Sequence, residues 1–488
     1  MSPQIKIDRI EILLPVIIAT FYVAVNSDST SPFLPFRQTH IDSQIFQYMG
    51  YSIMNGKVPY TDLFDHKGLL LFFLNGLGLL ISKTYGIMLL QVINLSATIY
   101  VWYKGLVFVK ERLYKYLIII AILFCLSVYD SVGNCTEEWS LFFLSYPLMV
   151  YTNYVHKGQK FIETYKLFSI GICVGAICLL RINNVAPVLG IFIYCAYKAI
   201  KEGEYNYLFR SIFLIFVGFA LPIGLASLYM YAIDGYRGID NMFYANVLFN
   251  IDYKSVYGGN PSVLARTRFF YKTMLPCLFL LLVIKERKDY VIPLFLGFII
   301  DIPATGNAEN YCYLLVCMPL MVFALGCIDN SKFKYVCLLI LVCFFAKTFI
   351  KNFSIHNFNR QIEGNNVEAI EKSLSSIPRK EWNNVWQYGT AYMLKDLMKL
   401  DILQPNRMFL PSQMGESKRL MQEEKHKIQK VKPKFILEAV YHVEDWLNMT
   451  RHYQGSESDE NFIRENYELV SSNVGEEGTV VNCYKFKD

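Results

Sequence analysis

Long apolar blocks fill most of the first 350 residues of this 488-residue chain and constrain its fold more than any other feature. Many of these blocks approach the roughly 20 residues that an α-helix needs to cross a bilayer. The chain is 54% hydrophobic and 18% charged, whereas soluble proteins carry about 25% charged residues. We therefore expect a polytopic α-helical membrane module over residues 1–350 and a separate polar region over residues 351–488.

About 11 spans are expected from the apolar blocks. They cover residues 10–26, 86–108, 116–130, 138–155, 167–181, 184–200, 211–232, 269–284, 290–302, 311–327 and 335–350. One further stretch, "GLLLFFLNGLGLLI" at 68–81, has 14 residues. That length is typical of an interfacial or re-entrant helix rather than a span.

The distribution of Lys and Arg decides between these two interpretations of 68–81, because cytoplasmic loops are enriched in both residues. If 68–81 lies in the interface and the N-terminus is cytoplasmic, the cytoplasmic connections hold 17 Lys and Arg in 52 residues. The outer connections then hold 9 in 118 residues. A spanning 68–81 would move the basic loops outward, so the charge pattern predicts interfacial helices in the first outer loop.

The same topology places residues 351–488 outside the cytoplasm. This region alternates strand-like pieces, such as "KFILEA" and "TVVNCYKF", with helix-like pieces, such as "AYMLKDLMKL". The alternation predicts a small extracytoplasmic α/β domain. The net charge of +6 is explained by basic cytoplasmic loops and needs no nucleic-acid partner.

Polar residues gather where the predicted outer loops meet the spans. Asp42 follows the first span, and "DLFDHKG" comes later in the same loop. The candidate site residues from the four outer segments are Asp42, Asp65, His66, Lys67, Asn134, Glu137, Glu138, Arg181, Asn310 and Tyr311. Acids and bases at a membrane surface can bind a lipid phosphate, hold a metal or transfer protons.

Each of these residues also has a structural interpretation. An acid outside a helix is usually solvated, which is the better interpretation of Asp62 and Asp65 taken singly. Arg181 could extend from a span end to the interface, as long basic side chains do. Asn310 and Tyr311 could anchor a helix end. The joint pattern, rather than any single residue, favours a functional site.

The stretch from Asp42 to Gly68, "DSQIFQYMGYSIMNGKVPYTDLFDHKG", resembles the first outer loop of GT-C membrane glycosyltransferases. The resemblance extends to the bacterial branch with protein mannosyltransferase-like enzymes (glycosyltransferase family 39-like), aminoarabinose transferases and Rgt-type lipopolysaccharide core transferases. "GNCTEEW" is similar to the second-loop acid segment, with Glu137 as the match, and "GAICLLRINN" to the segment with a basic residue, here Arg181. Leu69 replaces a common Pro after Lys67, and Asn310 stands where relatives often have His.

This resemblance, which covers roughly residues 1–350, implies an inverting transferase with a GT-C-like fold in the bacterial inner membrane. It implies a polyprenyl-phosphate sugar donor and a glycan, lipid or protein acceptor at the outer face. Asp42 is then the expected catalytic base, and Glu137 the acid that positions the acceptor or Lys67. Lys67 and Arg181 are expected to bind the donor phosphate, and the other residues of the candidate set to contact substrate. No cofactor is required by these residues, and a divalent metal stays open.

Two other classes remain open at this stage. A lipid-linked sugar flippase or other transporter would place its ionisable groups near the middle of the membrane and often show inverted repeats. An O-antigen-type polymerase or ligase would place arginines in a large late outer loop, and loop 233–268 does contain Arg237, Arg266 and Arg268. Donor chemistry separates the three classes.

Overall fold

The computed structural model describes most of the helical module and of the C-terminal region. The described residues are 9–26, 41–129, 133–251, 287–305, 315–328, 335–340, 342–343, 366–390, 393–407, 418–424, 426–440, 457–475 and 478–487. Asn310, Tyr311, Arg266, Arg268 and the expected span 269–284 lie outside them.

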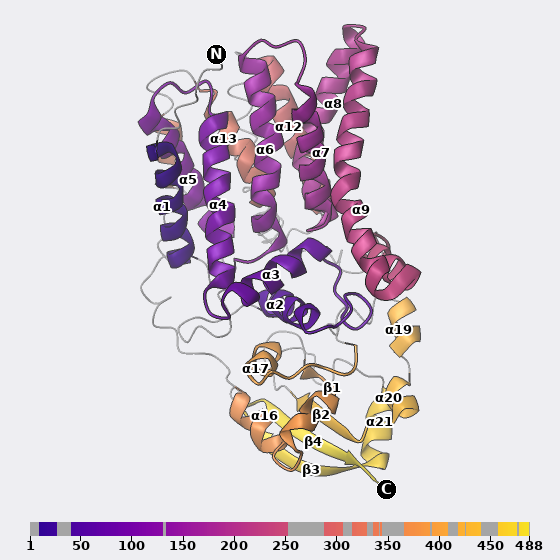
Figure 1. Ribbon diagram of the computed structural model, residues 1–488. Helices are drawn as coiled ribbons and strands as arrows, with labels where there is room; N and C mark the ends of the chain where they lie inside the picture. Colours follow the sequence, from indigo (N-terminus) through magenta and orange to yellow (C-terminus); the bar gives the residue numbers. More distant parts are fainter. Residues whose placement is uncertain are drawn as a thin grey trace.

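A bundle of upright helices forms the larger part of the molecule (Figure 1). Its members are α1 (Arg9–Asn26), α4 (Gly86–Gly105), α5 (Arg112–Tyr129), α6 (Thr136–His156), α7 (Thr164–Cys178), α8 (Ala186–Lys201), α9 (Tyr205–Phe243), α12 (Lys288–Thr305) and α13 (Met318–Leu325). The 3₁₀-helix η1 (Ile182–Val185) joins α7 to α8, and the π-helix η2 (Tyr244–Leu248) continues α9.

Two short helices, α2 (Ile41–Met54) and α3 (Leu69–Ile81), lie across one end of the bundle rather than along it (Figure 1). We call this the α2–α3 end. The connections between α4 and α5, α6 and α7, and α8 and α9 lie at the other end, which we call the basic-loop end. The chain therefore enters and leaves stretch 68–81 at the same end of the bundle, as the interfacial interpretation requires.

Helix length and hydropathy alone qualify two helices of the described part for crossing a membrane, Gly86–Gly105 and Tyr205–Ile251. In the second, 17% of the most apolar window is buried, so its large apolar side chains face away from the protein. A membrane is the natural surrounding for such a surface. The count of about 11 spans stays a prediction.

Glycines set the closest helix contacts. A Cβ on Gly171 of α7 would fall 2.2 Å from the carbonyl oxygen of Ile215 in α9, and one on Gly175 would fall 2.4 Å from Pro222. Gly171 and Gly175 are four residues apart, which is the spacing that lets membrane helices approach closely. Gly190 of α8 meets Gly297 of α12 in the same way, with 2.2 Å from its added Cβ to the Gly297 nitrogen.

The C-terminal region contains a four-stranded sheet with the order β1-β2-β4-β3. The strands are β1 (Trp386–Tyr388), β2 (Phe435–Val440), β3 (Tyr467–Val474) and β4 (Val480–Phe486). β1 pairs with β2 in parallel, and the other two pairings are antiparallel. Around the sheet lie α16 (Val367–Ser373), η4 (Arg379–Asn384), α17 (Leu394–Lys399), α19 (Lys418–Glu424), α20 (Lys427–Val431) and α21 (Glu457–Asn466). The expected mixture of strands and helices is present.

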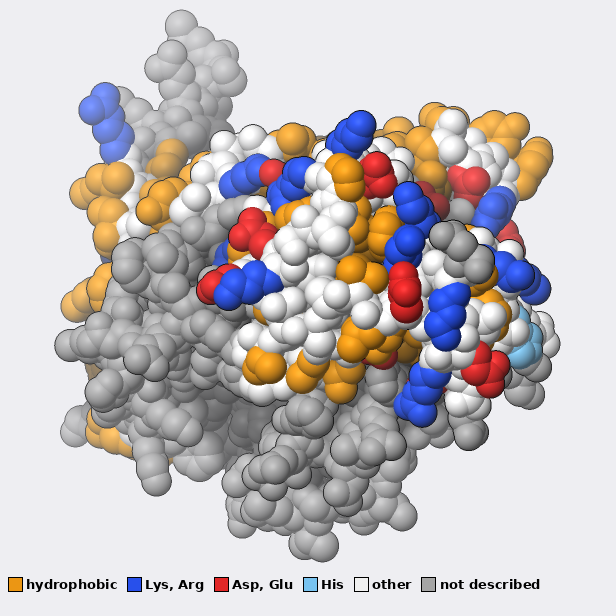
Figure 2. Space-filling view, turned by 90° about the horizontal axis from the view of Figure 1, so that it is seen from below, with side chains coloured by type: hydrophobic (Ala, Val, Ile, Leu, Met, Phe, Trp, Pro, Cys, Tyr) orange, Lys and Arg blue, Asp and Glu red, His pale blue; other side chains and the backbone are white. Residues whose placement is uncertain are grey.

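The α/β region packs directly against the end of the bundle that contains α2 and α3. The backbone N–H of Gln404 donates to the Tyr48 hydroxyl over 3.0 Å, and the Tyr51 hydroxyl donates to Asp401 over 2.9 Å. A single apolar cluster contains side chains of α2, α3, α16 and α17. Viewed from this side, acidic and basic side chains are interspersed over the α/β region (Figure 2).

Candidate active site

Segments far apart in the sequence meet at the α2–α3 end of the bundle. The loop before α3 crosses the end of α7, and the backbone N–H of Gly68 donates to the carbonyl of Leu180 over 3.0 Å. The N–H of Leu70 donates to the carbonyl of Leu179, also over 3.0 Å. Lys67 and Arg181 directly adjoin these paired residues, so backbone hydrogen bonds bring the two basic positions together.

Gly68 makes this approach possible. A Cβ at this position would lie 2.0 Å from the Leu179 carbonyl oxygen and 2.1 Å from its carbonyl carbon. Both are backbone atoms that cannot rotate away, so any side chain would push the two segments apart. A glycine at the end of "DHKG" is therefore a packing requirement of the site.

Arg181 forms a buried ion pair with Glu137. Its Nη1 lies 2.8 Å from Glu137 Oε1, and the two side chains are 13% and 3% exposed. The Thr136 hydroxyl donates to the second oxygen of Glu137 over 2.9 Å. Glu137 thus orients Arg181, whereas the sequence interpretation had it positioning the acceptor or Lys67. An arginine extended to the interface would not be enclosed in this way.

Lys67 contacts the imidazole of His66, with 2.6 Å between Nζ and Nε2. Burial lowers the pKa of His66 well below its usual value, and the charges of Lys67 and Arg181 act in the same direction. A neutral imidazole accepts the hydrogen bond from the ammonium group. His66 therefore contacts Lys67 as a neutral group and adds no third positive charge to the site.

Asp65 and Asp62 are not simple solvated loop residues. Asp65 is 2% exposed, and its Oδ1 accepts the backbone N–H of Lys67 over 2.8 Å. Asp62 is half-buried, and its Oδ2 accepts the N–H of Val58 over 2.8 Å. Both carboxylates stabilise the turns that lead to Lys67, as Asp side chains do in such turns.

Asn134 and Glu138 belong to a buried network that ties α2, α3 and α4 to α6. The Asn134 amide donates to Ser43 over 2.9 Å and to Asn75 over 2.8 Å. The carboxylate of Glu138 accepts the backbone N–H of Asn134 over 2.6 Å and the amide of Gln91 over 3.2 Å. Asn134 is fully buried and Glu138 is 6% exposed. Their side chains make structural contacts in this geometry, and the substrate contacts expected for them stay predictions.

Asp42 lies in the first turn of α2 and is exposed. Its neighbour Ser43 accepts the hydrogen bond from Asn134, which precedes Glu137 by three residues. Asp42 is thereby held at the same end of the bundle as the Arg181–Glu137 pair. The arrangement places an accessible carboxylate on one element and two cations on others.

A buried carboxylate that the sequence interpretation passed over lies beside this pair. Asp301 of α12 is 1% exposed, and the Cys317 thiol donates to its Oδ2 over 2.8 Å. It is close enough to Glu137 for their charges to interact. The signal was available, because an acid inside an apolar segment is costly and typically functional.

The described residues contain no group of three or more His, Cys, Asp or Glu side chains that could hold a metal ion. Lys67 and Arg181 supply two cations to the described part of the site, and Asp42 in the first turn of α2 supplies a carboxylate. Two cations can neutralise an anion such as a phosphate, and a nearby carboxylate can accept a proton.

No family model and no curated protein matches this sequence. Among solved structures, the chain is similar to the oligosaccharyltransferase of Archaeoglobus fulgidus, from a crystal structure of its complex with zinc and sulfate. The identity is 14%, the TM-score is 0.49, and the match covers 87% of this chain and 67% of that one. That protein has the GT-C fold that the first-loop motif resembles.

Proposed function

We propose that the protein is a membrane glycosyltransferase that takes a sugar from a polyprenyl-phosphate donor and transfers it to an acceptor hydroxyl at the α2–α3 end. The observation that supports this most strongly is the backbone pairing of Gly68 and Leu70 with Leu180 and Leu179, which sets Lys67 beside Arg181. Two adjacent cations at a membrane surface suit a lipid phosphate.

In the proposed reaction, an acceptor oxygen attacks the anomeric carbon of the donor sugar and inverts it. The bond between that carbon and the phosphate oxygen breaks, and its electron pair leaves with the phosphate. Asp42 accepts the acceptor proton, while Lys67 and Arg181 stabilise the charge that develops on the phosphate. Glu137 is a positioning residue, since it acts through Arg181.

In this proposal the donor lipid lies along α3. This helix is apolar apart from the buried Asn75 and lies across the end of the bundle, with Leu77, Leu80 and Ile81 exposed. An exposed apolar helix beside two cations matches a molecule whose phosphate ends a hydrocarbon chain. The outward orientation of this end is proposed from the charge pattern of the loops, and the bacterial inner membrane from the resemblance of the first-loop motif.

Purified protein with a radiolabelled polyprenyl-phosphate sugar and a mixed acceptor fraction tests the proposal. Asp42→Asn removes the proton acceptor and keeps the shape, so turnover should fall at least about a hundredfold while the donor still binds. Asp62→Asn, which alters a turn, is the matched control and should lose less.

The outcome also separates the alternatives. Near wild-type turnover in Asp42→Asn, with loss in Asp62→Asn, would assign the base elsewhere. Donor that crosses a vesicle bilayer intact would identify a flippase, and a requirement for diphosphate-linked glycan would identify a polymerase or ligase. Either of these results would overturn the transferase proposal.

A further inference from the structure

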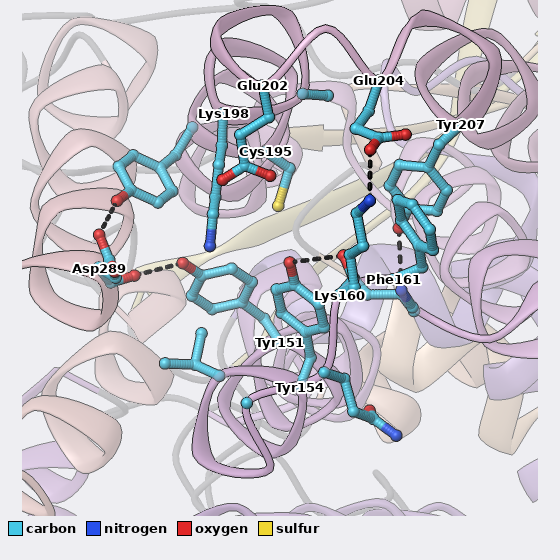
Figure 3. Close-up of a pocket in the computed structure, with 16 residues that line it drawn as sticks. Tyr151, Tyr154, Lys160, Phe161, Cys195, Lys198, Glu202, Glu204, Tyr207 and Asp289 are labelled. Carbon is cyan, nitrogen blue, oxygen red and sulfur yellow. Dashed lines mark hydrogen bonds and ion pairs between the residues drawn. The ribbon is translucent and has the colours of Figure 1, made fainter.

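A polar cavity of about 200 Å³ lies at the basic-loop end, opposite the candidate active site (Figure 3). The loops after α6 and α8 and the first turn of α12 enclose it. The charged side chains that line it are Lys160, Lys198, Glu202, Glu204 and Asp289. The proposed transfer reaction uses none of them.

Tyrosine hydroxyls fix the walls of this cavity. Tyr151 donates to the backbone carbonyl of Asp289, and Tyr194 donates to its carboxylate. The hydroxyl of Tyr207 accepts the backbone N–H of Ile162 over 2.9 Å. These bonds tie α6, α8, α9 and α12 together around the cavity (Figure 3). Specific hydrogen bonds therefore define the walls of the cavity.

Two side chains of opposite charge line the cavity without an ion-pair partner in the described part of the chain, the half-buried Lys198 and the exposed Glu202. Lys160 pairs with Glu204, at 2.5 Å between nitrogen and oxygen. The Glu202 backbone N–H donates to the Lys198 carbonyl over 3.0 Å, but within the described residues neither side chain forms a hydrogen bond or an ion pair. Figure 3 shows the ammonium group of Lys198 directed into the cavity and the Glu202 carboxylate beside it. The half-buried Lys198 is therefore placed to bind an incoming anion.

An apolar cavity of about 340 Å³ adjoins the polar one. The two have Tyr151, Ile162, Cys195, Ala199 and Tyr207 in common as lining residues, so they lie side by side. The apolar part lies among α6, α7, α8 and α9, and its lining is almost wholly aliphatic and aromatic. A cavity lined by charged side chains next to an apolar cavity matches an amphiphilic molecule.

Helix packing explains why this space exists. Because they have no side chain, Gly171 and Gly175 let α9 pack closely against α7, and Gly190 and Gly297 let α8 pack closely against α12. α8 and α9 are thereby held by different partners, and the apolar cavity lies between them. Its α9 side includes exposed Ile212 and Phe216, so within the described residues it opens toward the surroundings of the bundle.

We propose that this double cavity binds a glycerophospholipid with a primary-ammonium headgroup, taken from the membrane leaflet at the basic-loop end. Its phosphate pairs with Lys198, its ammonium with Glu202, and an acyl chain enters the apolar cavity. The pairing follows from charge complementarity, since a zwitterionic head matches two opposite free charges. The inference rests on the bundle lying in a membrane, as proposed above, and is independent of the transfer chemistry.

Native mass spectrometry of the whole protein in detergent tests this site. Phosphatidylethanolamine, phosphatidylglycerol and diacylglycerol of identical chains are added separately to delipidated protein. Phosphatidylethanolamine should be retained most strongly and diacylglycerol least. Lys198→Ala should weaken the retention of phosphatidylethanolamine at least about tenfold, the loss expected for one charged hydrogen-bond partner. Lys201→Ala, which removes an exposed lysine one turn away, is the matched control and should retain it.

A second pair of variants probes the apolar part. Ala196→Phe places a ring in the apolar cavity and should exclude the acyl chain, whereas Ile193→Phe on the exposed face of α8 should not. Equal retention of all three lipids, or equal behaviour of Lys198→Ala and Lys201→Ala, would overturn the proposal. Lipid retention in a protein without transferase activity would leave this site standing and refute only the proposed function.

Discussion

The two ends of the bundle handle charge in opposite ways. At the α2–α3 end, Arg181 is enclosed with Glu137, and His66 and Asp65 are buried beside Lys67. At the basic-loop end, ion pairs such as Lys160–Glu204 are much more exposed, at 64% and 30%. Enclosed charges are expensive and must be held by backbone and hydrogen bonds, whereas exposed ones need little support. Of these two ends, the one with the candidate active site therefore encloses its charged side chains more fully.

The largest effect is expected from a test of whether the two ends of the bundle lie on opposite sides of a membrane. Glu111→Cys and Ser376→Cys, made with Cys343→Ser and with serine at positions 277 and 312, add an exposed thiol at each end of the described part of the bundle. In intact cells an impermeant maleimide should label position 376 and leave position 111 unlabelled, because the basic loops favour the cytoplasm. Labelling of position 111 from outside would contradict the topology.

The next largest effect is expected from Gly68→Ala. Its Cβ would meet the Leu179 backbone at 2.0 Å and separate Lys67 from Arg181. A displacement of about 1 Å can cost roughly a hundredfold in rate, so transfer should fall by about that factor. Turnover normalised to the amount of folded protein is the measurement.

Gly224→Ala provides the matched control for Gly68→Ala. An added Cβ at Gly224 has no atom within 4 Å, and this glycine lies inside α9. It should retain wild-type turnover. If both alanine variants behave alike, the close backbone approach does not organise the site.

Removing one partner from an enclosed ion pair and one partner from a more exposed pair measures how much each pair contributes to stability. Arg181→Ala leaves Glu137 buried and unpaired and should destabilise the protein by about 3–5 kcal/mol. Lys104→Ala breaks the more exposed pair with Glu11, whose side chains are 39% and 17% exposed, and should cost less than about 1 kcal/mol. Thermal unfolding in detergent measures both.

Donor affinity separates a phosphate ligand from a purely structural Arg181. Arg181→Ala should weaken the apparent donor affinity by about one to two decades, and Arg181→Lys by less. Unchanged donor affinity in Arg181→Ala, together with a loss of stability, would assign Arg181 to the scaffold alone.

The smallest effect is expected at the contact between α2 and the α/β region. Burial raises the pKa of Asp401, but hydrogen bonds from Tyr51 and Lys83 outweigh it and lower the pKa below 3.8. The stabilisation that ionised Asp401 gives to the folded protein is present when the pH is above the usual carboxyl pKa. It is lost as the pH falls through the lowered pKa. Lys83→Ala should therefore cost at most about 1 kcal/mol near neutral pH, and its melting temperature should converge with wild type on acidification. A constant difference at all pH values would exclude the ionised pair as its cause.

Helix positions were largely predictable, because apolar blocks report burial in lipid or protein over many residues. The expected blocks 86–108 and 184–200 correspond to α4 (Gly86–Gly105) and α8 (Ala186–Lys201). β3 was not foreseen, because half of its sequence "YELVSSNV" is polar and its position depends on pairing with β4. Such a strand is defined by its neighbours rather than by its own composition.

The candidate site was predictable in its residue types and only partly in their roles. Lys67 and Arg181 stand out in the sequence as basic residues beside apolar segments. In the structure, the backbone segments that carry them lie next to each other. The enclosure of Glu137 by Arg181 and the structural use of Asn134 depend on contacts across more than 40 residues. Local patterns carry no information about such contacts. Asn310 and Tyr311 lie outside the described residues, so their predicted roles stay predictions.

The contacts around the first outer loop also determine when the site can exist during synthesis. Gly68 and Leu70, which follow Lys67, have their backbone partners only after residues 179 and 180 have been made, and Tyr48 meets Gln404 more than 350 residues after its own synthesis. Because domains fold as the chain emerges, early segments must wait for such distant partners. A nascent chain that already contains every basic residue of the site would still lack the α/β cover. The α2–α3 end therefore completes its contacts with the α/β region only after residue 404 has been made.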